Sequence, residues 1–209
     1  LAYNSKPDAL QKTLKTGKSC FDLNYVGVKS PQFSFTRLKG AYPQLGVEMG
    51  STGEVACFGE DIHEALLKSM IAAGTIIPKK TILVSISGDK NRFAFLESVR
   101  MLENMKFELY ATENTRKFYS EHDIKMKLLH KIHEHKKPNV LDYLEHKKID
   151  MVIHIEESDR VYENDDPYIL KRPAIDYSVA LVQNLQLARM FVQALYLNPE
   201  LKIKSWQEY

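Results

Sequence analysis

The sequence predicts an α/β fold with a five-stranded, mostly parallel sheet and helices on both faces. Beyond residue 80, short apolar runs alternate with amphipathic stretches, which is the pattern of repeated strand–helix units. The first of these runs, residues 81–87, is typical of a strand that is buried on both faces. Before residue 60 the chain instead carries closely spaced glycines, which indicate turns and a different kind of unit.

Residues 1–76 are predicted to form this different unit. Its expected elements are a helix at 9–16, a strand at 32–35 and a second helix at 60–73. On the second helix, the residues that recur at helical spacing and should face a core are Ile62, Leu66 and Met70. Roughly 60 residues of this kind bury too little apolar surface to fold alone. We therefore expect the unit to pack against further protein.

Residues 77–209 are predicted to form the α/β domain. Strands are expected at 81–87, 107–112, 126–132, 151–155 and 180–182. Helices are expected at 91–105, 113–122, 140–146, 168–177 and 184–196, the fourth of them interrupted at Pro173. The apolar residues expected to face the core from the first and last of these helices are Phe93, Leu96, Val99 and Leu102, and Leu187, Met190, Phe191, Ala194 and Leu195.

The composition argues against several classes of function. Basic residues number 29 and acidic residues 27, so the net charge of +2 gives no reason to expect nucleic-acid binding. No apolar run reaches the roughly 18 residues of a membrane helix, and the start of the chain lacks the apolar core of a signal peptide. The missing initiating Met indicates an excised segment. Cys20 and Cys57 are too few for a disulfide framework, which fits a cytoplasmic or mitochondrial protein.

Ligands of parallel sheets bind beyond the carboxyl ends of the strands, so the residues that follow each strand are the candidates. Lys90 follows the first strand of the domain, Thr112, Asn114 and Thr115 follow the second, and Lys131 lies near the end of the third. Hydroxyls and free amides at a helix start, with nearby lysines, suit a phosphate or carboxylate. The alternatives are ordinary helix capping by the threonines and a solvated Lys90.

Two other groups of polar residues invite a chemical interpretation. His130, His133 and His135 lie near Glu134, but alternation along a strand would separate the histidines, and we expect no metal site. Glu156 and Glu157 follow the fourth strand and suggest acid–base catalysis, which requires burial of one carboxylate. Their polar flanks instead predict surface charges.

Two blocks between residues 33 and 59, FSFTRLKG and EMGSTGEVACFG, are highly specific. Looser motifs follow them along the chain, among them SGDK, ELYATENT, IDMVIHI and ILKRPAIDYSVALVQN. In this order, the motifs together resemble carbamoyl-phosphate synthetase, large subunit, in its glutamine-dependent or multifunctional pyrimidine-pathway form. The resemblance covers essentially the whole chain. It implies that residues 1–76 are the tail of an ATP-grasp domain and that residues 77–209 are a regulatory domain similar in fold to methylglyoxal synthase.

The resemblance also implies a function for the regulatory domain. Relatives of different types respond to uridine monophosphate and inosine monophosphate, to uridine triphosphate and phosphoribosyl pyrophosphate, or to N-acetylglutamate. The phosphate-contacting residues of the family fall on Lys90, Thr112, Thr115 and Lys131, with Asn114 in the same turn. This chain departs from the bacterial Asn-Thr-Thr motif at His154-Ile155-Glu156, and its only tryptophan, Trp206, is not in the loop where N-acetylglutamate-dependent relatives carry one.

As part of such an enzyme, the chain would hold no catalytic residue and no cofactor of its own. ATP and Mg²⁺ or Mn²⁺ would serve the ATP-grasp domains, and the partners would be those domains, a glutaminase and, in a multifunctional chain, aspartate transcarbamoylase. The product would feed pyrimidine or arginine biosynthesis. One alternative is a free-standing lyase of the methylglyoxal synthase kind, with Glu156 or Glu157 as the base. Another is a module for homo-oligomerisation.

Overall fold

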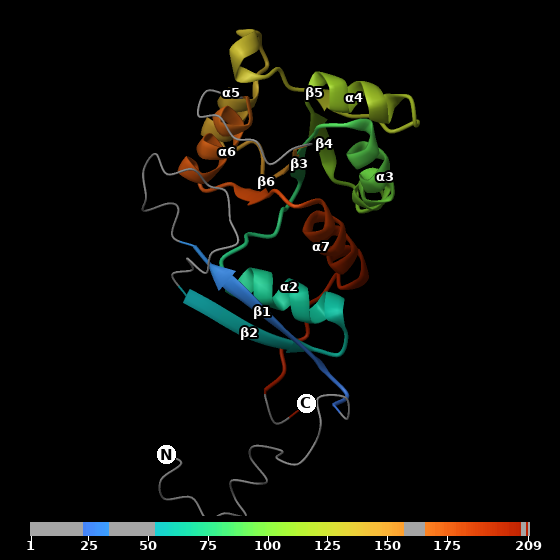
Figure 1. The fold of residues 1–209 in the computed structure, drawn as a ribbon, viewed down its shortest axis with the longest axis vertical. Coiled ribbons are helices and arrows are strands. Elements are labelled where there is room, and N and C mark those ends of the chain that lie inside the picture. The colour runs from blue at the N-terminus through green and yellow to red at the C-terminus, as the bar shows by residue number, and fades with distance from the viewer. Residues whose placement is uncertain (1–22, 34–52, 157–165, 206–207, 209) are drawn as a thin grey trace, which may run out of the picture.

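The computed structural model describes residues 23–33, 53–156, 166–205 and 208, and only the backbone of residues 166–169. In these residues, a five-stranded sheet with helices on both sides lies above a smaller two-stranded sheet (Figure 1). The helix predicted at 9–16 lies outside the described residues, as do Ser34 and Phe35 of the first predicted strand.

The smaller sheet consists of β1 (Val26–Gln32) and β2 (Gly53–Gly59), which pair antiparallel with Val26 opposite Gly59. Of the strand predicted at 32–35, Gln32 is the last residue of β1 and Phe33 follows the strand. Residues 26–31 alternate in burial, as expected for a strand with one face toward the core.

Helix α2 (Ile62–Ala72) follows β2 directly and confirms the helix predicted at 60–73. The Asp61 carboxylate starts it by accepting hydrogen bonds from the backbone N–H groups of His63 and Glu64, at 2.8 and 2.9 Å. Leu66 and Met70 are buried as predicted. Ile62 is 40% exposed, contrary to prediction, because the first residue of the helix lies at the edge of the packed face.

The five-stranded sheet is parallel throughout, with the strand order β5-β4-β3-β6-β7. Its strands are β3 (Thr81–Ile86), β4 (Glu108–Ala111), β5 (Lys127–Leu128), β6 (Met151–Ile155) and β7 (Ala180–Val182). The predicted fold class and the parallel arrangement are confirmed. The sheet places the carboxyl end of β3 between those of β4 and β6.

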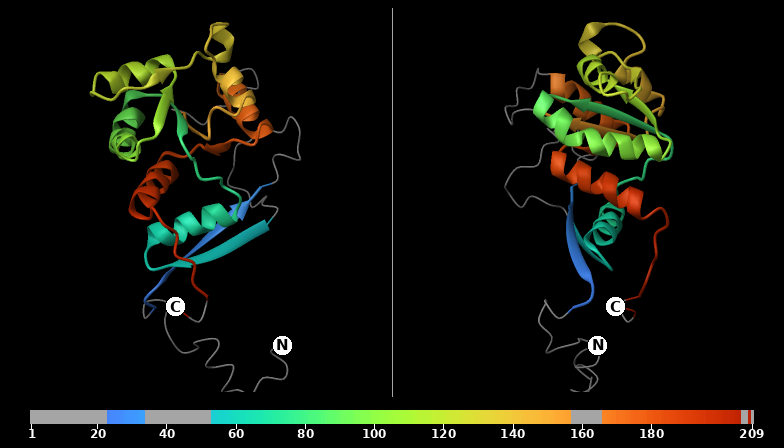
Figure 2. Two further views of the ribbon diagram at one scale, coloured as in Figure 1. Left: turned by 180° about the vertical axis from the view of Figure 1, so that it is seen from behind. Right: turned by 90° about the vertical axis from the view of Figure 1, so that its right-hand side faces the viewer.

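Helices cover both faces of this sheet, as predicted (Figure 2). Alternate residues of β3, β4, β6 and β7 belong to two separate apolar clusters, one on each face. One cluster includes residues of α3 (Asp89–Asn104), α4 (Glu113–Ser120) and α7 (Leu185–Leu197). The other includes residues of α5 (Val140–Glu145) and α6 (Asp166–Asp176).

The prediction of a strand over residues 126–132 is wrong in extent. Strand β5 has two residues, and the chain then turns into a short 3₁₀ helix, η3 (Ile132–Glu134). The Glu134 carboxylate accepts from the Lys131 backbone N–H at 3.2 Å and pairs with His130 Nδ1 at 2.9 Å. These local side-chain bonds compete with the sheet ladder and take the chain away from it.

Three details of the predicted helices are also corrected. Phe93 is 57% exposed, whereas Phe95 is fully buried, because α3 begins at Asp89 and turns Phe95 toward the sheet. Leu187, at 37% exposure, lies on the rim of the inward face of α7. Pro173 does not interrupt α6, because the buried neighbours Leu170 and Ala174 hold the helix on the sheet despite the lost backbone bond.

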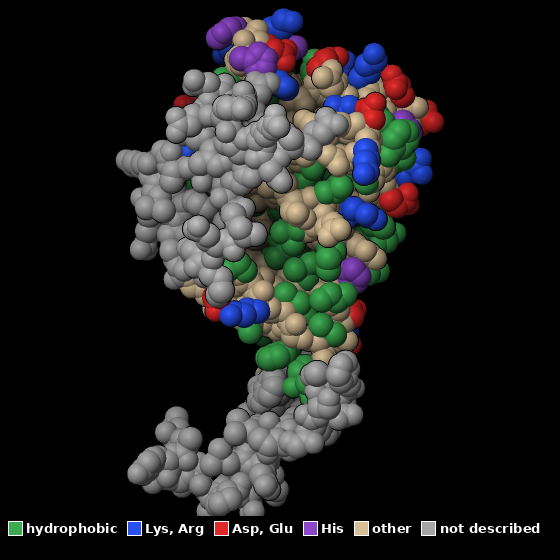
Figure 3. All heavy atoms as spheres, viewed as in Figure 1, with side chains coloured by type: hydrophobic (Ala, Val, Ile, Leu, Met, Phe, Trp, Pro, Cys, Tyr) green, Lys and Arg blue, Asp and Glu red, His purple; other side chains and the backbone are tan. Residues whose placement is uncertain are grey.

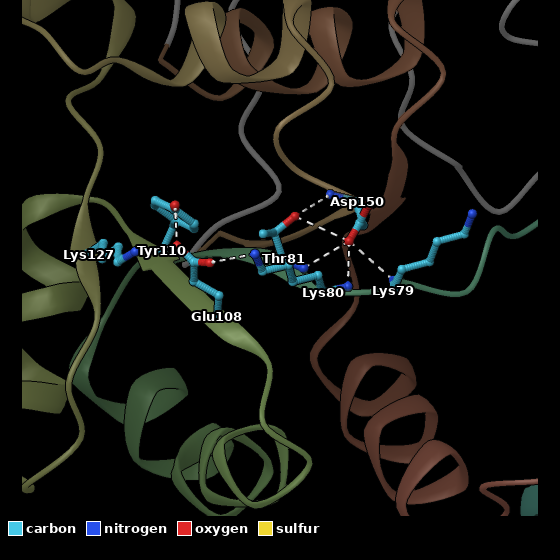
Figure 4. Close-up of polar contacts among 7 residues, drawn as sticks. All are labelled: Lys79, Lys80, Thr81, Glu108, Tyr110, Lys127 and Asp150. Atoms are coloured by element: carbon cyan, nitrogen blue, oxygen red, sulfur yellow. Dashed lines mark hydrogen bonds and ion pairs between the residues drawn. The ribbon is translucent and has the colours of Figure 1, made fainter.

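The joint between α2 and β3 is fixed by one carboxylate (Figure 4). Asp150 Oδ2 accepts hydrogen bonds from the successive backbone N–H groups of Lys79, Lys80 and Thr81, at 3.2, 2.7 and 2.8 Å. Burial alone would raise the pKa of Asp150, but these backbone donors outweigh it and hold the pKa below its ordinary value. Since Asp150 directly precedes β6, the joint is tied to the centre of the sheet.

Helix α7 lies between the five-stranded sheet and α2 (Figure 2). Leu66, Leu67 and Met70 of α2 belong to the same buried cluster as Phe191 and Ala194 of α7 and the residues of the sheet. The apolar core of the five-stranded sheet thus continues through α7 to α2, and Val28 of β1 packs against it. In the part of the chain that the structure describes, every helix is too short or too polar to cross a membrane.

Candidate functional site

The five residues predicted to bind an anion lie along the carboxyl edge of β3, β4 and β5. Lys90 and Asn114 are exposed in the first turns of α3 and α4. Thr112 and Thr115 are buried, with 3% and 1% exposure. Lys131 is half-buried just before η3. Because β4 lies between β5 and β3, the turn after β4 is flanked by the segments that carry the two lysines.

Thr112 forms part of a buried polar row that crosses the sheet. The register places Ser85 of β3 beside His154 of β6, and the Thr112 hydroxyl lies 3.3 Å from Ser85 Oγ. A second contact, from Thr112 Oγ1 to Thr115 Oγ1, measures 3.4 Å. Both contacts are long for hydrogen bonds between hydroxyls, and Thr112 is itself buried.

Thr115 is held differently, because its hydroxyl binds the backbone of β3. Thr115 Oγ1 accepts from the Ile86 N–H at 3.0 Å and donates to the Ile86 carbonyl at 3.1 Å. These bonds join α4 to the last residue of β3. The hydroxyl therefore has a structural role that the sequence did not reveal, whereas the Thr115 backbone N–H lies in the first turn of α4.

The start of α4 carries the arrangement that the sequence predicts for an anion cradle. Thr112 is the N-cap residue, yet its side chain makes no capping hydrogen bond. The first N–H groups of the helix therefore lack the usual side-chain partner among the described residues. The start of α3 is likewise uncapped, at Gly88, which has φ of 77°. Two helix N-termini at this edge favour negative charge, part of which Asp89 and Glu113 already supply in the first turns of α3 and α4.

Glu156 is not a surface charge, and this prediction is corrected. Its side chain is 16% exposed, and its Oε1 lies 2.5 Å from Lys171 Nζ and 3.1 Å from His154 Nε2. Burial would raise the pKa of Glu156, but the hydrogen bonds from His154 and Lys171 prevail and keep it below its ordinary value. The polar residues that flank Glu156 in the sequence suggested exposure. Its buried partner Lys171 lies on α6, which the local sequence does not reveal. Glu157 lies outside the described residues.

Two side chains of α3 fasten the ends of the central strands around this site. Asn91 Nδ2 donates to the carbonyls of Ser87 and Glu156, at 3.0 and 3.3 Å, and so joins the segments after β3 and β6. Arg92 Nε donates to the Ile86 carbonyl at 2.9 Å, and its guanidinium pairs with Asp89 at 2.6 Å. These hydrogen bonds hold the start of α3 against the ends of β3 and β6.

Several polar residues of this region, among them Ser85 and Lys171, have no role predicted from the sequence, and His154 is noted there only as a departure from a family motif. Ser85 and His154 lie inside strands, where a small hydroxyl or an imidazole usually completes a core. Lys171 follows Leu170 on α6 and is 2% exposed. A signal existed for Lys171, because a lysine between buried positions of a helix requires a partner, and Glu156 lay at the end of the neighbouring strand.

The histidine-rich segment after β5 does not form a compact metal site among the described residues. His130 pairs with Glu134, and His133 and His135 are exposed. No group of three or more metal-binding side chains gathers elsewhere in the described ranges. The segment instead adds charge and polarity to the α5 end of the molecule.

A cavity of about 600 Å³ lies away from this edge. Its walls come from β1, the end of α2 and the segment around β7, and they include Val28, Met70, Ile76 and Leu181. These walls are mostly apolar and suit an anion poorly. On the face seen in Figure 3, hydrophobic side chains gather around α2 and α7, whereas charged ones gather toward α3, α4 and α5. We therefore place the candidate site at the carboxyl edge.

Comparison with known proteins shows which family the chain is similar to. A family model for the MGS-like domain matches residues 94–183. Multifunctional protein CAD of Squalus acanthias is 43% identical over 186 residues, which are 82% of this chain and 8% of that protein. Multifunctional protein URA2 of Saccharomyces cerevisiae is 42% identical over 192 residues, 87% of the chain and 9% of that protein.

A third relative is the mitochondrial carbamoyl-phosphate synthase (ammonia) of Mus musculus. It is 35% identical over 190 residues, which are 89% of this chain and 12% of that protein. The chain thus spans only 8 to 12% of the length of these three relatives. The similarity extends on both sides of the MGS-like domain, as the motifs between residues 33 and 59 predict. The chain belongs to the carbamoyl-phosphate synthase family, of which it represents the C-terminal, MGS-like region.

Proposed function

We propose that this region binds a small anionic effector and thereby regulates ATP-dependent synthesis of carbamoyl phosphate elsewhere in a larger enzyme. The observation that carries the proposal is the start of α4, which lacks a side-chain cap and follows β4 at the carboxyl edge of the sheet. Thr112, Asn114 and Thr115 supply its first turn, and Lys90 and Lys131 flank it in the strand order. Such an edge favours a phosphate or carboxylate.

The apolar core and the hydrogen bonds around β3 could transmit a structural change from the effector site to α2. Thr115 and Arg92 bind the end of β3, and the start of β3 is tied through Asp150 to the joint with α2. Coupling of about 1–3 kcal/mol between two sites changes an apparent affinity 5- to 150-fold. The fold therefore has the connections that regulation requires.

The proposal extends to the enzyme around this region. ATP with Mg²⁺ or Mn²⁺ would be used by ATP-grasp domains, of which residues 1–76 would be the tail, and ammonia would come from a glutaminase. In a multifunctional chain, aspartate transcarbamoylase would consume the product for pyrimidine synthesis. The cytoplasm is the proposed compartment, with the mitochondrion as the alternative for a relative of the ammonia-using type.

The free-standing lyase is less well supported by the site. Glu156 or Glu157 would be its base, and Glu157 lies outside the described residues. Lys171 and His154 already engage Glu156 Oε1, which leaves this carboxylate less available to take a proton from a substrate. An assay for methylglyoxal from dihydroxyacetone phosphate separates the two functions.

The effector role is tested by calorimetric titration of the chain with uridine triphosphate, uridine monophosphate, phosphoribosyl pyrophosphate and N-acetylglutamate. We expect at least one to bind below millimolar concentration. Lys90→Ala should weaken that ligand by about 1.5–3 kcal/mol, the contribution of a hydrogen bond to a charged group. Lys125→Ala, an exposed lysine before β5, is the matched control and should bind like the parent chain. Failure of all four ligands to bind would refute the effector role.

A further inference from the structure

Large hydrophobic side chains gather on the surface at one end of the molecule. Of the eight that are exposed in the described part of the chain, five lie at the start of α2, in the last turn of α7 or in the segment that follows α7. These five, here called the end patch, are Ile62, Tyr196, Leu197, Leu201 and Ile203. Exposed hydrophobic side chains are ordinary when scattered, whereas a group of them indicates an interaction surface.

The parts of the end patch are neighbours in space. Asp61, directly before α2, and Leu197, at the end of α7, line the same small pocket of about 310 Å³. Further along the chain, Lys204 Nζ pairs with Glu60 Oε1, which holds the segment after α7 against the turn before α2. The end patch is therefore one surface, built from two helices and the segment that follows the second.

In this segment, Lys204 is turned toward the protein, whereas its apolar neighbours are turned away from it. The side chain of Lys204 is 28% exposed. Leu201 and Ile203 are 41% and 93% exposed. An isoleucine more exposed than the lysine beside it is the reverse of the usual distribution. Contact with water is unfavourable for such apolar side chains, and a second protein surface would relieve it.

The charges around the end patch are nearly balanced. Glu60 pairs with Lys204, and the Asp61 carboxylate accepts from N–H groups at the start of α2. The exposed Glu200 and Lys202 carry opposite charges. Without a large excess of either sign, this surface has no electrostatic preference for a strongly charged partner. Apolar burial is then the main source of affinity, and an apolar protein surface is the partner that fits.

The end patch lies near the places where the described chain connects to further sequence. Strand β1 starts at Val26, which pairs with Gly59 just before the turn into α2. The start of β1 and the segment after α7 lie at the same end of the molecule (Figure 2). The chain spans only 8 to 12% of the length of its three relatives, so most of a protein of this kind lies outside it. A domain attached through either connection is held near the end patch at a high effective concentration.

We infer that the end patch is the docking surface for a neighbouring domain of the same larger enzyme, which contacts it through an apolar surface of its own. The inference rests on the proposal that this region works within a larger enzyme. The covalent connection favours that domain over a second copy of the chain, because a separate copy must reach the patch by collision. Docking covers Leu201 and Ile203 and leaves the ion pair of Lys204 with Glu60 in place beneath them.

Hydroxyl-radical footprinting with mass spectrometry tests the docking, by comparing the chain alone with the full-length enzyme that contains it. Phe93, which is exposed on α3, serves as the internal reference. Relative to Phe93, the oxidation of Tyr196 and Ile203 should be at least about fivefold slower in the full-length enzyme, because the core of a protein interface excludes water. An unchanged ratio would overturn the inference.

A serine substitution at the most exposed position of the patch tests the role of its apolar side chain. In the chain alone, Ile203→Ser should leave the melting temperature unchanged, because the side chain is 93% exposed there. In the full-length enzyme, it should make the oxidation of Tyr196 about threefold faster, because the docked surface loses apolar contact. Ile76→Ser, at an exposed position beyond the other end of α2, is the matched control and should leave Tyr196 protected.

Two further measurements separate the possible occupants and the two proposals. If sedimentation shows a dimer of the chain alone that Ile203→Ser dissociates, the patch belongs to a second copy and the inference is wrong. If the full-length enzyme makes carbamoyl phosphate with an unchanged oxidation ratio, the proposed function stands and the docking is refuted. A protected patch in an enzyme that makes no carbamoyl phosphate supports the docking and refutes the proposed function. The comparison of the parent proteins decides even if Ile203→Ser does not fold.

Discussion

At the scale of single residues, some buried hydroxyls bind the backbone of the sheet, and others make only weak contacts with neighbouring side chains. Thr115 binds both backbone groups of Ile86, whereas Thr112 makes only contacts of 3.3 and 3.4 Å. The sequence predicted both threonines as one pair of ligands. It could not distinguish them, because the partner of Thr115 lies on a strand 29 residues away.

Thr115→Val should destabilise the fold by about 1–3 kcal/mol, because it leaves the buried Ile86 N–H without its acceptor. The free energy of unfolding is measured by urea denaturation. Thr115→Ser retains the hydroxyl and should recover most of the loss. If the valine variant is as stable as the parent, the hydrogen bond between Thr115 and Ile86 makes no net contribution to the free energy of unfolding.

The buried pair of Glu156 and Lys171 should make stability depend on acid pH. The folded pKa of Glu156 lies below its ordinary value of 4.5, so its contribution is present above pH 4.5 and is lost as the pH falls through the folded value. Urea midpoints measured from neutral pH downward should therefore fall less steeply in Glu156→Gln than in the parent. Equal slopes would contradict the ionised, paired carboxylate described here.

At the scale of elements, the sequence predicts regular segments well and side-chain-directed turns poorly. The strand at 151–155 and the short strand at 180–182 are confirmed to the residue, because their apolar runs are packed on both faces of the sheet. Strand β5 is cut short by Glu134, whose bonds to Lys131 and His130 depend on local geometry rather than on hydrophobic pattern. The joint before β3 likewise depends on Asp150, which lies about 70 residues further along the chain.

Asp150→Asn should destabilise the chain by about 1–3 kcal/mol, because three backbone donors lose a charged acceptor. Asp142→Asn is the matched control, since Asp142 contributes only a surface ion pair with Lys137 and should change stability by less than about 1 kcal/mol. Hydrogen exchange should also show faster exchange at the amides of residues 79–81 in the first variant. Unchanged exchange there would rule out the role of Asp150 at the joint.

The passage from β2 to α2 is a close backbone approach. A Cβ added at Gly59 would lie 2.5 Å from the backbone N of Ala65, so Gly59→Ala should cost about 1–3 kcal/mol of stability. Gly53→Ala, at the other end of the same strand, meets only the Gln32 side chain at 3.8 Å and should be nearly neutral. Thermal unfolding compares the two variants. Equal melting temperatures would mean that the turn relaxes freely.

At the scale of the whole molecule, the two units distinguished in the sequence share one core. Helix α7, the last helix of the α/β domain, packs between its own sheet and α2 of the preceding unit (Figure 2). The change of hydrophobic pattern after residue 76 predicts a domain boundary. The pattern within each segment does not predict how the two segments pack against each other. The boundary between residues 76 and 77 remains a prediction about chain organisation.

The candidate site could be placed from the sequence only in part. The rule for parallel sheets selects the carboxyl edge, and the structure brings together there the strands that precede the predicted residues, Lys90, Thr112, Asn114, Thr115 and Lys131. The buried row through Ser85 and His154, and the partner Lys171, depend on strand order and on the packing of α6. Neither can be read from residue spacing.

The central claim is that the carboxyl edge around α4 binds an anionic effector, and amide NMR of the labelled chain tests it most directly. On addition of uridine triphosphate, the largest shift changes should fall on the amides of residues 113–115, with smaller ones at residues 87–90. Lys125→Ala should leave this pattern intact. Saturable changes confined to the opposite edge of the sheet, around residues 79–81, would contradict the account.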